Sequence, residues 1–318
     1  MALNLLFVAD PLDRFNVERD TTFAMMLEAQ RRGHACFEGH HTGLQVERSR
    51  AFSRCNRATV QRAAQGSHYA RGPWETLPLD HFDAVFMRTD PPMDDRYITA
   101  LWILDLADRA KTQLINEPRG ILAANEKMYA LQFPEFTPET LVTSSAAEVK
   151  RFFKDVGEDI ILKPLDGHGG SGVLRVTAGD RNFNSMIELL THEGRRWVMV
   201  QRYIKAARQG DKRILLVDGN PVGAILRVPS DEDNRGNIHV GAVVQKASIT
   251  AREQELCAAL SPVLTRDGLR FVGIDVIGEL LTEVNVTSPT GAQEIARFDG
   301  SCPEGVLLDS VEARAVRA

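Results

Sequence analysis

Short apolar runs and segments of helical spacing alternate along the first third of the chain. The runs at residues 4–10, 82–87 and 113–116 have the length and flanks of buried strands. After the first run, Asp20 supplies an N-cap and Gly33 a stop for a helix whose apolar positions recur at helical spacing. This alternation predicts a mostly parallel sheet, with ligands beyond the carboxyl ends of its strands.

After about residue 120 the pattern becomes a mixture of helices and antiparallel strands. A helix is predicted over residues 121–133. Further along, Asp218-Gly219 is a typical two-residue turn between two apolar strands. The predicted class is α/β leading into α+β. The polar stretch 40–79 fits no pattern and is not assigned.

Composition narrows the classes of function. The 318 residues are 43% hydrophobic and 25% charged, as in folded soluble proteins. A net charge of −5 argues against a surface for nucleic acid or an anionic membrane. Asp10-Pro11 ends the first apolar run, and no basic segment precedes it, so it is interpreted as a strand and not a signal peptide. The four cysteines form no CxxC pair, which favours reduced thiols and a cytoplasmic location.

The stretch DGHGGSGVLRV, residues 166–176, contains Gly167, Gly169, Gly170 and Gly172 between two apolar runs. A P-loop or a dinucleotide-binding loop opens a helix, whereas a strand follows this loop. We interpret it as a hairpin whose amide N–H groups fold over a phosphate. On the loop alone, a mobile hairpin without a ligand is an equal alternative.

Two lysines bear on that choice. Lys163 lies within the apolar run IILKPL, just before the loop. A lysine in a buried strand needs a partner for its charge, and a phosphate is a suitable one. The alternative is an edge strand with Lys163 in solvent. Lys127, in ANEKMYA, is a weaker candidate because most helix lysines are solvated.

Asp275, Glu283 and Asn285 flank a turn near the C-terminus. Glu283 and Asn285 are two apart on a strand and share a face. A three-residue turn, 278–280, would pair Asp275 with Glu283 on that face, whereas a two-residue turn would not. Two carboxylates and an amide oxygen suit magnesium rather than zinc. The alternative is a solvated sheet face.

Arginines form the last group of candidates, namely Arg88, Arg213, Arg227 and Arg235. Arginine binds carboxylates in a bidentate manner, although surface arginines are common. Arg235 lies in the polar stretch 229–242, which is interpreted either as a lid over a substrate or as a flexible loop.

Taken together, these residues resemble the bacterial glutathione synthetases of the ATP-grasp superfamily. The resembling stretches are FAMMLEAQRRG, RTDPP, NEKMYA, PETLVT, DIILKPLDGHGG, GDKRILLVDG, FVGIDVIG and LTEVNVTSP. The resemblance implies an N-terminal Rossmann-like parallel-sheet domain, residues 1–121. A two-subdomain ATP-grasp fold would follow, with the glycine loop in residues 122–200 and the magnesium site and lid in residues 201–318.

The activity implied is ligation of γ-glutamylcysteine to glycine with ATP, through an acyl phosphate. The implied cofactors are ATP and Mg²⁺, with Mn²⁺ as an alternative, and the implied assembly is a homotetramer. The nucleotide ligands would be Lys127, Lys163, Gly167, Gly169, Gly170, Gln201, Tyr203 and Asp211. The substrates would contact Arg213, Arg227, Arg235, Asn237, Asn285, Ser288 and Thr290. Catalysis would rest on Arg213, Arg235 and Lys163, and magnesium on Asp275, Glu283 and Asn285.

The chain departs from the family pattern at three places. Thr89 stands where family members carry a lysine, Ala242-Val243 replaces a glycine and an arginine of the lid, and GAQEIARFDG follows TSPT. A ligase for a different dipeptide or amine, and a nucleotide-binding regulator without ligase activity, are therefore kept as alternatives. A nicotinamide-dependent dehydrogenase is disfavoured because ADPLDRFN has no glycine after the first strand.

Overall fold

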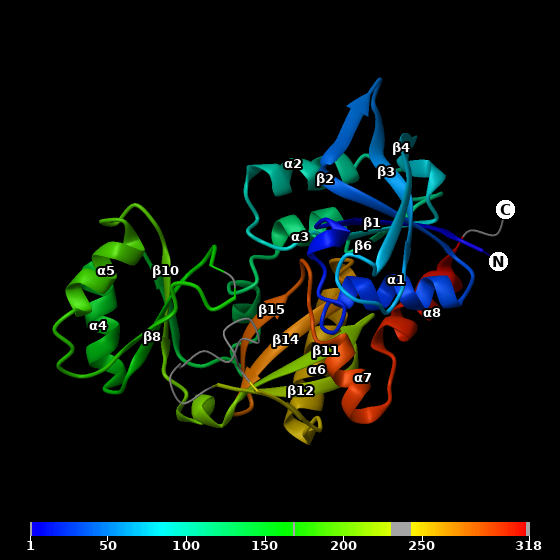
Figure 1. The fold of residues 1–318 in the computed structure, drawn as a ribbon. Coiled ribbons are helices and arrows are strands. Elements are labelled where there is room, and N and C mark those ends of the chain that lie inside the picture. The colour runs from blue at the N-terminus through cyan, green and yellow to red at the C-terminus, as the bar shows by residue number, and fades with distance from the viewer. Residues whose placement is uncertain (1, 168, 230–242, 316–318) are drawn as a thin grey trace.

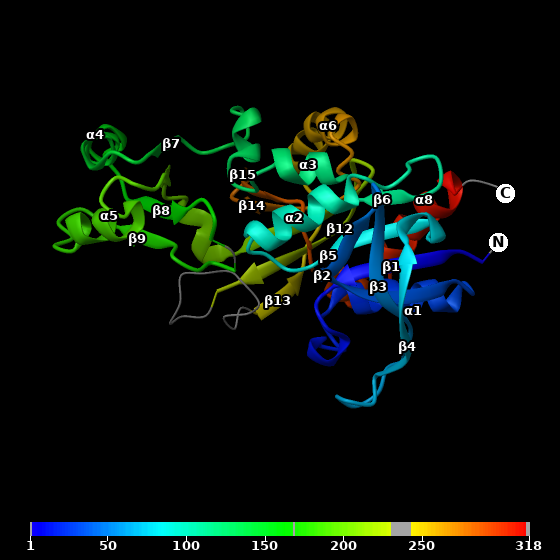
Figure 2. The ribbon, with the colours of Figure 1, turned by 90° about the horizontal axis from the view of Figure 1, so that it is seen from above.

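The computed structural model describes residues 2–167, 169–229 and 243–315, which are built around three β-sheets (Figure 1). Two sheets pack into one body, and the remaining sheet belongs to a small lobe set to one side. Figure 2, turned by 90°, shows the same separation. The mixed α/β class is as predicted. None of the described helices has the length and apolar character needed to cross a membrane.

The first sheet has six strands in the order β4-β3-β2-β1-β5-β6. In chain order they are β1 (Asn4–Ala9), β2 (Ala35–Glu47), β3 (Arg50–Val60), β4 (Tyr69–Pro78), β5 (Ala84–Arg88) and β6 (Gln113–Ile115). Strands β2, β1, β5 and β6 run parallel, whereas β2, β3 and β4 form an antiparallel meander. The expected parallel arrangement therefore holds for only one part of the sheet.

The antiparallel part is the stretch that the sequence pattern left unassigned. A register shift between Gly39 and Leu44 breaks the alternation of β2, and β4 is exposed along most of its length. A strand that buries neither face has no reason to alternate apolar and polar residues. The alternation of apolar and polar residues that would have identified this strand is therefore absent from the sequence.

Helices cover both faces of the first sheet. They include α1 (Thr21–Arg31), α2 (Asp95–Leu104) and α3 (Pro118–Ala123), with short 3₁₀ turns at Leu12–Arg14 and Leu79–His81. The Asp20 carboxylate accepts a hydrogen bond from the Phe23 N–H at 2.8 Å, so Asp20 is the N-cap of α1 as predicted.

The prediction of a helix over residues 121–133 is wrong. Helix α3 ends at Ala123, and only a 3₁₀ turn, Tyr129–Gln132, follows. The Asn125 side-chain oxygen accepts hydrogen bonds from the N–H groups of Lys127 and Met128. This local bond offers the backbone an alternative to the helix, and it places Lys127 in a turn.

The small lobe comprises residues 140–202 and has a core of its own. Its elements are β7 (Thr140–Thr143), α4 (Ala146–Val156), β8 (Ile160–Pro164), β9 (Leu174–Val176), α5 (Phe183–Thr191) and β10 (Val198–Arg202). The strand order is β7-β10-β8-β9. Residues from both helices and all four strands pack in a cluster separate from the rest of the molecule. Helix α4 begins at its Ser145 cap and ends at Gly157, which takes a left-handed conformation.

The third sheet is antiparallel throughout, in the order β13-β12-β11-β14-β15. Its strands are β11 (Asp211–Val217), β12 (Asn220–Val228), β13 (Val243–Lys246), β14 (Phe271–Ile277) and β15 (Leu280–Asn285). A 3₁₀ turn, Lys205–Gln209, precedes it, and α6 (Ala251–Arg266), α7 (Ala292–Asp299) and α8 (Pro303–Arg314) complete the chain. The predicted turn at Asp218-Gly219 is confirmed, with φ of 47° and 75°.

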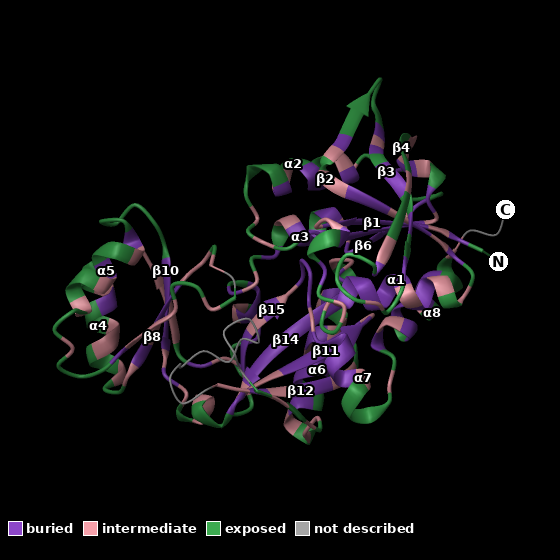
Figure 3. Cartoon of the chain, in the orientation of Figure 1, coloured by how far each residue is buried: buried purple, intermediate pink, exposed green. Residues whose placement is uncertain are grey.

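The first and third sheets share their cores. In β1, Leu5 and Phe7 belong to a cluster with α1, α7 and α8, while Leu6 and Val8 belong to one with α2 and α6. Strand β11 contributes to both clusters in the same alternating way. Figure 3 shows the buried residues concentrated where these two sheets meet. Asn116 adds a polar link, since its side chain bonds the backbone of Phe271 on β14 and of Val286 after β15.

A pH-dependent stability is expected from Asp20. Burial raises its pKa from 3.8 to about 6, against the opposing hydrogen bond from Phe23. The folded protein therefore binds more protons than the unfolded chain between these values. The stability from this group is full below about pH 4 and is lost as the pH rises through about 6. The unfolding free energy of the wild type, relative to Asp20→Asn, should fall by about 2–3 kcal/mol between pH 4 and pH 7.

Urea unfolding of both proteins at the two pH values measures this difference. Asp94→Asn, at the N-cap of α2, controls for placing an amide at a helix cap. A difference that stays constant with pH would show that Asp20 is ionised in the folded protein.

Candidate functional site

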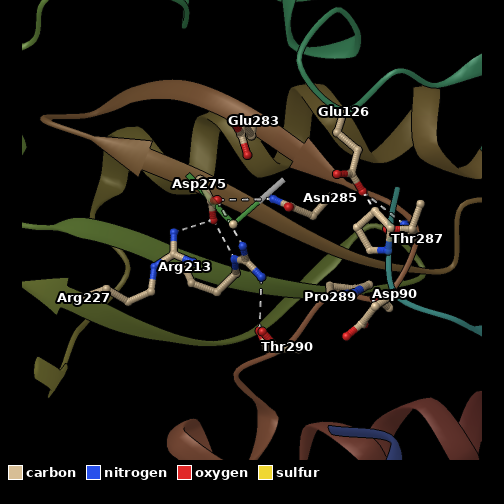
Figure 4. A pocket seen from close by; sticks show the side chains of 13 residues that line it. Asp90, Glu126, Arg213, Arg227, Asp275, Glu283, Asn285, Thr287, Pro289 and Thr290 are labelled. Carbon is tan, nitrogen blue, oxygen red and sulfur yellow. Dashed lines mark hydrogen bonds and ion pairs between the residues drawn. The ribbon is translucent and has the colours of Figure 1, made fainter. Parts of the chain in front are cut away.

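A cavity of about 470 Å³ lies where the third sheet, the end of β5 and the glycine loop meet. We call it the central cavity (Figure 4). Its lining residues are Asp90, Pro91, Glu126, Gly169, Arg213, Arg227, Asp275, Glu283, Asn285, Thr287, Ser288, Pro289 and Thr290. Charged groups from both the N-terminal and C-terminal parts of the chain thus converge on one space.

The hairpin of β14 and β15 carries the predicted magnesium residues. Its turn has two residues, Gly278 and Glu279, both at positive φ, and not the three residues that the favoured pairing required. Asp275 nevertheless pairs with Glu283, because a register shift leaves Thr282 unpaired as a bulge. The predicted pairing is confirmed, but the bulge and not the turn produces it.

A row of charged residues crosses the inner face of this sheet. Asp211 and Arg213 are two apart on β11, so both face the same side. The backbone register pairs Asp211 with Arg227 on β12 and Arg213 with Asp275 on β14. Opposite charges therefore face each other across both neighbouring strands, which favours this register.

Asp275 is the centre of the row. Its carboxylate accepts from Arg213 Nε at 2.5 Å and Nη2 at 3.0 Å, and Arg227 Nη2 lies 3.0 Å from it. Burial alone would raise the pKa of Asp275, but the two guanidinium groups hold that pKa well below its usual range. Asp275 is thus ionised and shared by two arginines (Figure 4).

The residues fit a magnesium ion that is shared with a phosphate. Asn285 donates its amide N–H to Asp275 at 3.3 Å and to the Gly273 carbonyl at 3.1 Å, which leaves its oxygen as a ligand. Glu283 adds a partly exposed carboxylate. The described residues include no group of three or more His, Cys, Asp or Glu side chains placed to hold a metal. A metal here would therefore need further ligands from outside those residue types. Magnesium commonly completes its shell with water and phosphate oxygens.

Lys127 is buried, with 4% of its surface exposed, against the expectation of a solvated helix lysine. Its ammonium donates to the Gly167 carbonyl at 2.5 Å and lies 3.5 Å from the Glu283 carboxylate. Lys127 therefore bridges the glycine loop of the small lobe and the third sheet.

Lys163 is also buried, on β8 between β10 and β9. The alternative of a solvent-facing edge lysine is thereby excluded. Burial lowers the pKa of Lys163, and the charge of Glu283 opposes that effect. Within the described part of the chain, no hydrogen bond or ion pair satisfies its ammonium, so an anion from outside the chain is a suitable partner.

The glycine loop connects antiparallel strands β8 and β9, as predicted. Gly169 and Gly170 have φ of 59° and 78°, a region that favours glycine. Gly169 reaches the central cavity, while Gly167 meets Lys127. The loop thus lies beside both lysines, and residue 168 lies outside the described residues.

Among the predicted nucleotide residues, Gly169 lines the central cavity and the others lie outside its lining. The Gln201 amide on β10 donates to the Thr140 hydroxyl at 3.0 Å, and the Tyr203 ring stacks under the Arg175 guanidinium. Asp211 accepts from Arg227 at 2.5 Å, and burial raises the pKa of Asp211 to about 6. Their roles in binding a nucleotide stay predictions.

The predicted substrate residues divide into two groups. Arg213, Arg227, Asn285, Ser288 and Thr290 meet in the central cavity. The Ser288 hydroxyl donates to Asp90 at 2.5 Å, and the Thr290 carbonyl accepts from Arg213 at 3.2 Å. The predicted residues Arg235 and Asn237, and the departure at Ala242, lie outside the described residues.

Sequence reasoning missed Glu126 and Asp90. One Glu126 carboxylate oxygen accepts from the N–H groups of Val286 and Thr287 and from the Thr287 hydroxyl. Burial, followed by the charge of Glu283, raises the pKa of Glu126. Each residue lies within a noticed motif, NEK or RTDPP, but the sequence offers no sign that both reach one cavity.

Comparison with known proteins identifies the family of this chain. Residues 126–300 match the family described as prokaryotic glutathione synthetase, ATP-grasp domain, and residues 3–121 match its N-terminal domain. The chain belongs to the prokaryotic glutathione synthetase family. The resemblance inferred from sequence motifs is thereby confirmed.

Relatives in this family align along nearly their whole length. The glutathione synthetase of Nostoc sp. is 46% identical over 307 residues, covering 94% of each chain. That of Brucella melitensis is 43% identical over 314 residues, covering 99% of this chain and 100% of its own.

Solved structures of lower identity share the fold. D-cycloserine synthetase DcsG has a TM-score of 0.66 at 16% identity, over 98% of this chain and 99% of its own. The ATP-grasp ligase PsnB, solved with a peptide, Mg and ADP, has a TM-score of 0.63 at 18% identity, over 98% of each chain. The predicted ATP-grasp fold is confirmed.

Removing the central charge should destabilise the protein. Asp275→Asn would leave Arg213 and Arg227 without their shared carboxylate in a buried place. The unfolding free energy should fall by about 3–5 kcal/mol at neutral pH. Urea unfolding measures it, with Glu279→Gln in the turn of the same hairpin as the control. A loss below about 1 kcal/mol would show that the contacts of Asp275 with the two arginines contribute little to stability.

Proposed function

We propose that this protein is an ATP-dependent ligase that joins γ-glutamylcysteine to glycine, giving glutathione, ADP and phosphate. Family membership along the whole chain supports the activity. The observation that carries the proposal is a cavity lined by Gly169, Asp275, Glu283 and Asn285, beside which the buried Lys127 contacts both the glycine loop and Glu283. Lys163 is buried on the strand that leads into the same loop. These groups suit phosphoryl transfer, which needs positioning and charge neutralisation more than a protein nucleophile.

ATP would lie between the small lobe and the third sheet, with its phosphates beside the lysines. Lys127 and Lys163 would neutralise phosphate charge, and the N–H groups of Gly167, Gly169 and Gly170 would cover it. Lys163 is a buried residue whose ammonium has no partner among the described residues, which supports this placement. We assign the adenine to the neighbourhood of Gln201 and Tyr203, and the ribose to Asp211.

Magnesium would be held by Asp275, Glu283 and Asn285. When bound, it neutralises charge on the transferred phosphate and orients it. Manganese as a substitute stays a prediction from the family resemblance.

In the first step the cysteinyl carboxylate of the donor attacks the γ-phosphorus of ATP, and the bond to ADP breaks. Arg213 and Arg227 line the cavity and would orient this carboxylate. The Arg227 Nε has no hydrogen-bond partner among the described residues and is thus a spare donor.

In the second step the glycine amine attacks the acyl carbon, phosphate leaves, and the amine loses a proton. Ser288 and Thr290 would line the acceptor end. Residues 229–242, with Arg235 and Asn237, would exclude water from the acyl phosphate, which would otherwise hydrolyse.

We further propose a division of the chain at residues 121 and 200, a cytoplasmic location and a homotetramer. The separate core of the small lobe supports the boundary near residue 200. The location rests on the cysteine usage, and the assembly rests on the family resemblance.

Two substitutions test the nucleotide and metal residues. Glu283→Gln and Lys163→Ala should each lower kcat/KM at least about 100-fold, because the first removes a proposed magnesium ligand and the second removes a positive charge proposed to neutralise the transferred phosphate. Glu279→Gln and Lys150→Ala, exposed on the same hairpin and on α4, are the matched controls. Circular dichroism would verify folding. Near-normal turnover in either site variant would contradict its role.

Phosphate release from Mg-ATP tests the function as a whole. Release should require both γ-glutamylcysteine and glycine and should exceed that with other dipeptides and amines. Release with only another pair would keep the mechanism but change the substrate. Tight ATP binding without release for any pair would favour a regulator.

A further inference from the structure

The second step of the proposed reaction requires a group that accepts a proton. Glycine enters as an ammonium ion, whereas only the neutral amine has the electron pair that attacks the acyl carbon. Amide formation removes two protons from this nitrogen, and the departing phosphate can take one of them. None of the groups assigned above receives the other. A carboxylate fixed in the central cavity is a side chain that can perform this transfer.

Glu126 lines the central cavity and is held there by hydrogen bonds to the end of β15 and the residues after it. Its Oε1 accepts from the N–H groups of Val286 at 3.0 Å and Thr287 at 3.3 Å, and from the Thr287 hydroxyl at 2.9 Å. Its backbone carbonyl accepts from the Val284 N–H at 2.9 Å. These bonds occupy one carboxylate oxygen and fix the orientation of the side chain.

The other carboxylate oxygen of Glu126, Oε2, remains for a ligand. Within the described part of the chain, the hydrogen bonds to this carboxylate all end on Oε1. Figure 4 shows Oε2 on the side of the carboxylate away from Thr287, toward Asn285. A fixed carboxylate with one oxygen directed into a cavity has the geometry of a proton acceptor.

The other carboxylates that line the cavity are less suited to this task. Asp275 is shared by two arginines, and they hold its pKa well below the usual range. Glu283 lies 3.5 Å from the Lys127 ammonium and is assigned to magnesium. Asp90 is exposed. Burial raises the pKa of Glu126, so this carboxylate binds a proton more strongly than an exposed one.

Glu126 also lies at the end of the cavity where we place glycine. Its partner Thr287 directly precedes Ser288, and both residues line the cavity together with Thr290. Ser288 and Thr290 form the acceptor end in the function proposed above. A glycine amine at this end would therefore lie on the side of the cavity that Glu126 occupies.

We propose that Glu126 is the catalytic proton acceptor of the second step. Its Oε2 takes one proton from the glycine ammonium, and the freed electron pair forms the C–N bond to the acyl carbon. The C–O bond to the phosphate breaks, and the second proton of the nitrogen leaves with the phosphate. The proton on Glu126 passes to solvent when the products leave. This inference rests on the function proposed above.

Glu126→Gln separates proton transfer from the structural role of this side chain. The amide keeps a carbonyl oxygen for Val286 and Thr287 but cannot take a proton from an ammonium. With Mg-ATP, γ-glutamylcysteine and glycine, kcat should fall at least about 100-fold. In single-turnover rapid-quench experiments, ADP should form at the wild-type rate and glutathione much more slowly, because ADP is released from the donor in the first step.

Hydroxylamine in place of glycine provides a second measurement. This nucleophile is largely unprotonated at neutral pH and needs no proton acceptor before it attacks. Hydroxamate formation by Glu126→Gln should therefore stay near the wild-type rate. Glu135→Gln, an exposed carboxylate further along the same linker, is the matched control and should change neither rate.

Three results would overturn the role of Glu126 while the proposed function stands. They are near-normal turnover of Glu126→Gln with glycine, equal losses with glycine and hydroxylamine, and slow formation of ADP in the single turnover. The last two would show that Glu126 only holds the cavity wall. A wild type that forms no glutathione would overturn the proposed function together with this inference.

Discussion

The carboxylate of Asp275, held between Arg213 and Arg227, is the constraint on which the site depends. Three buried charges within hydrogen-bond distance tolerate little displacement, because any separation leaves one of them without a partner at a cost of several kcal/mol. They therefore fix the register of three adjacent strands. The bulge at Thr282 sets the position of the next strand, because without it the two-residue turn would place Glu283 on the opposite face from Asp275.

The site joins two parts of the molecule that fold around separate cores. The first and third sheets share clusters and the Asn116 bonds, whereas the small lobe packs on its own. Its glycine loop meets the third sheet through Lys127, which contacts both Gly167 and Glu283. A phosphate bound at Lys127, as proposed above, would therefore lie against both parts of the molecule. An anion between the two parts would offset the free-energy cost of burying the positive charges of Lys127 and Lys163.

The Ser288–Thr290 segment joins the N-terminal sheet to the third sheet. Asp90 accepts from Ser288, Arg88 donates to the Pro289 carbonyl, and Arg213 donates to the Thr290 carbonyl. This segment of the cavity wall therefore depends on contacts from both parts of the chain.

The sequence by itself determined the strand-and-helix alternation, the Asp20 cap, the Asp218-Gly219 turn and the family, because each depends on neighbouring residues or on an ordered series of motifs. It also identified Lys163, through the contradiction of a charge in an apolar strand. Only the tertiary structure decided the meander of residues 40–79, the turn around Lys127, and the convergence of Asp90 and Glu126. The meander gave no alternating pattern because β4 buries neither face, and the Asn125 side chain competes with the helix at Lys127. Asp90 and Glu126 meet residues more than a hundred positions away, about which a local pattern contains no information.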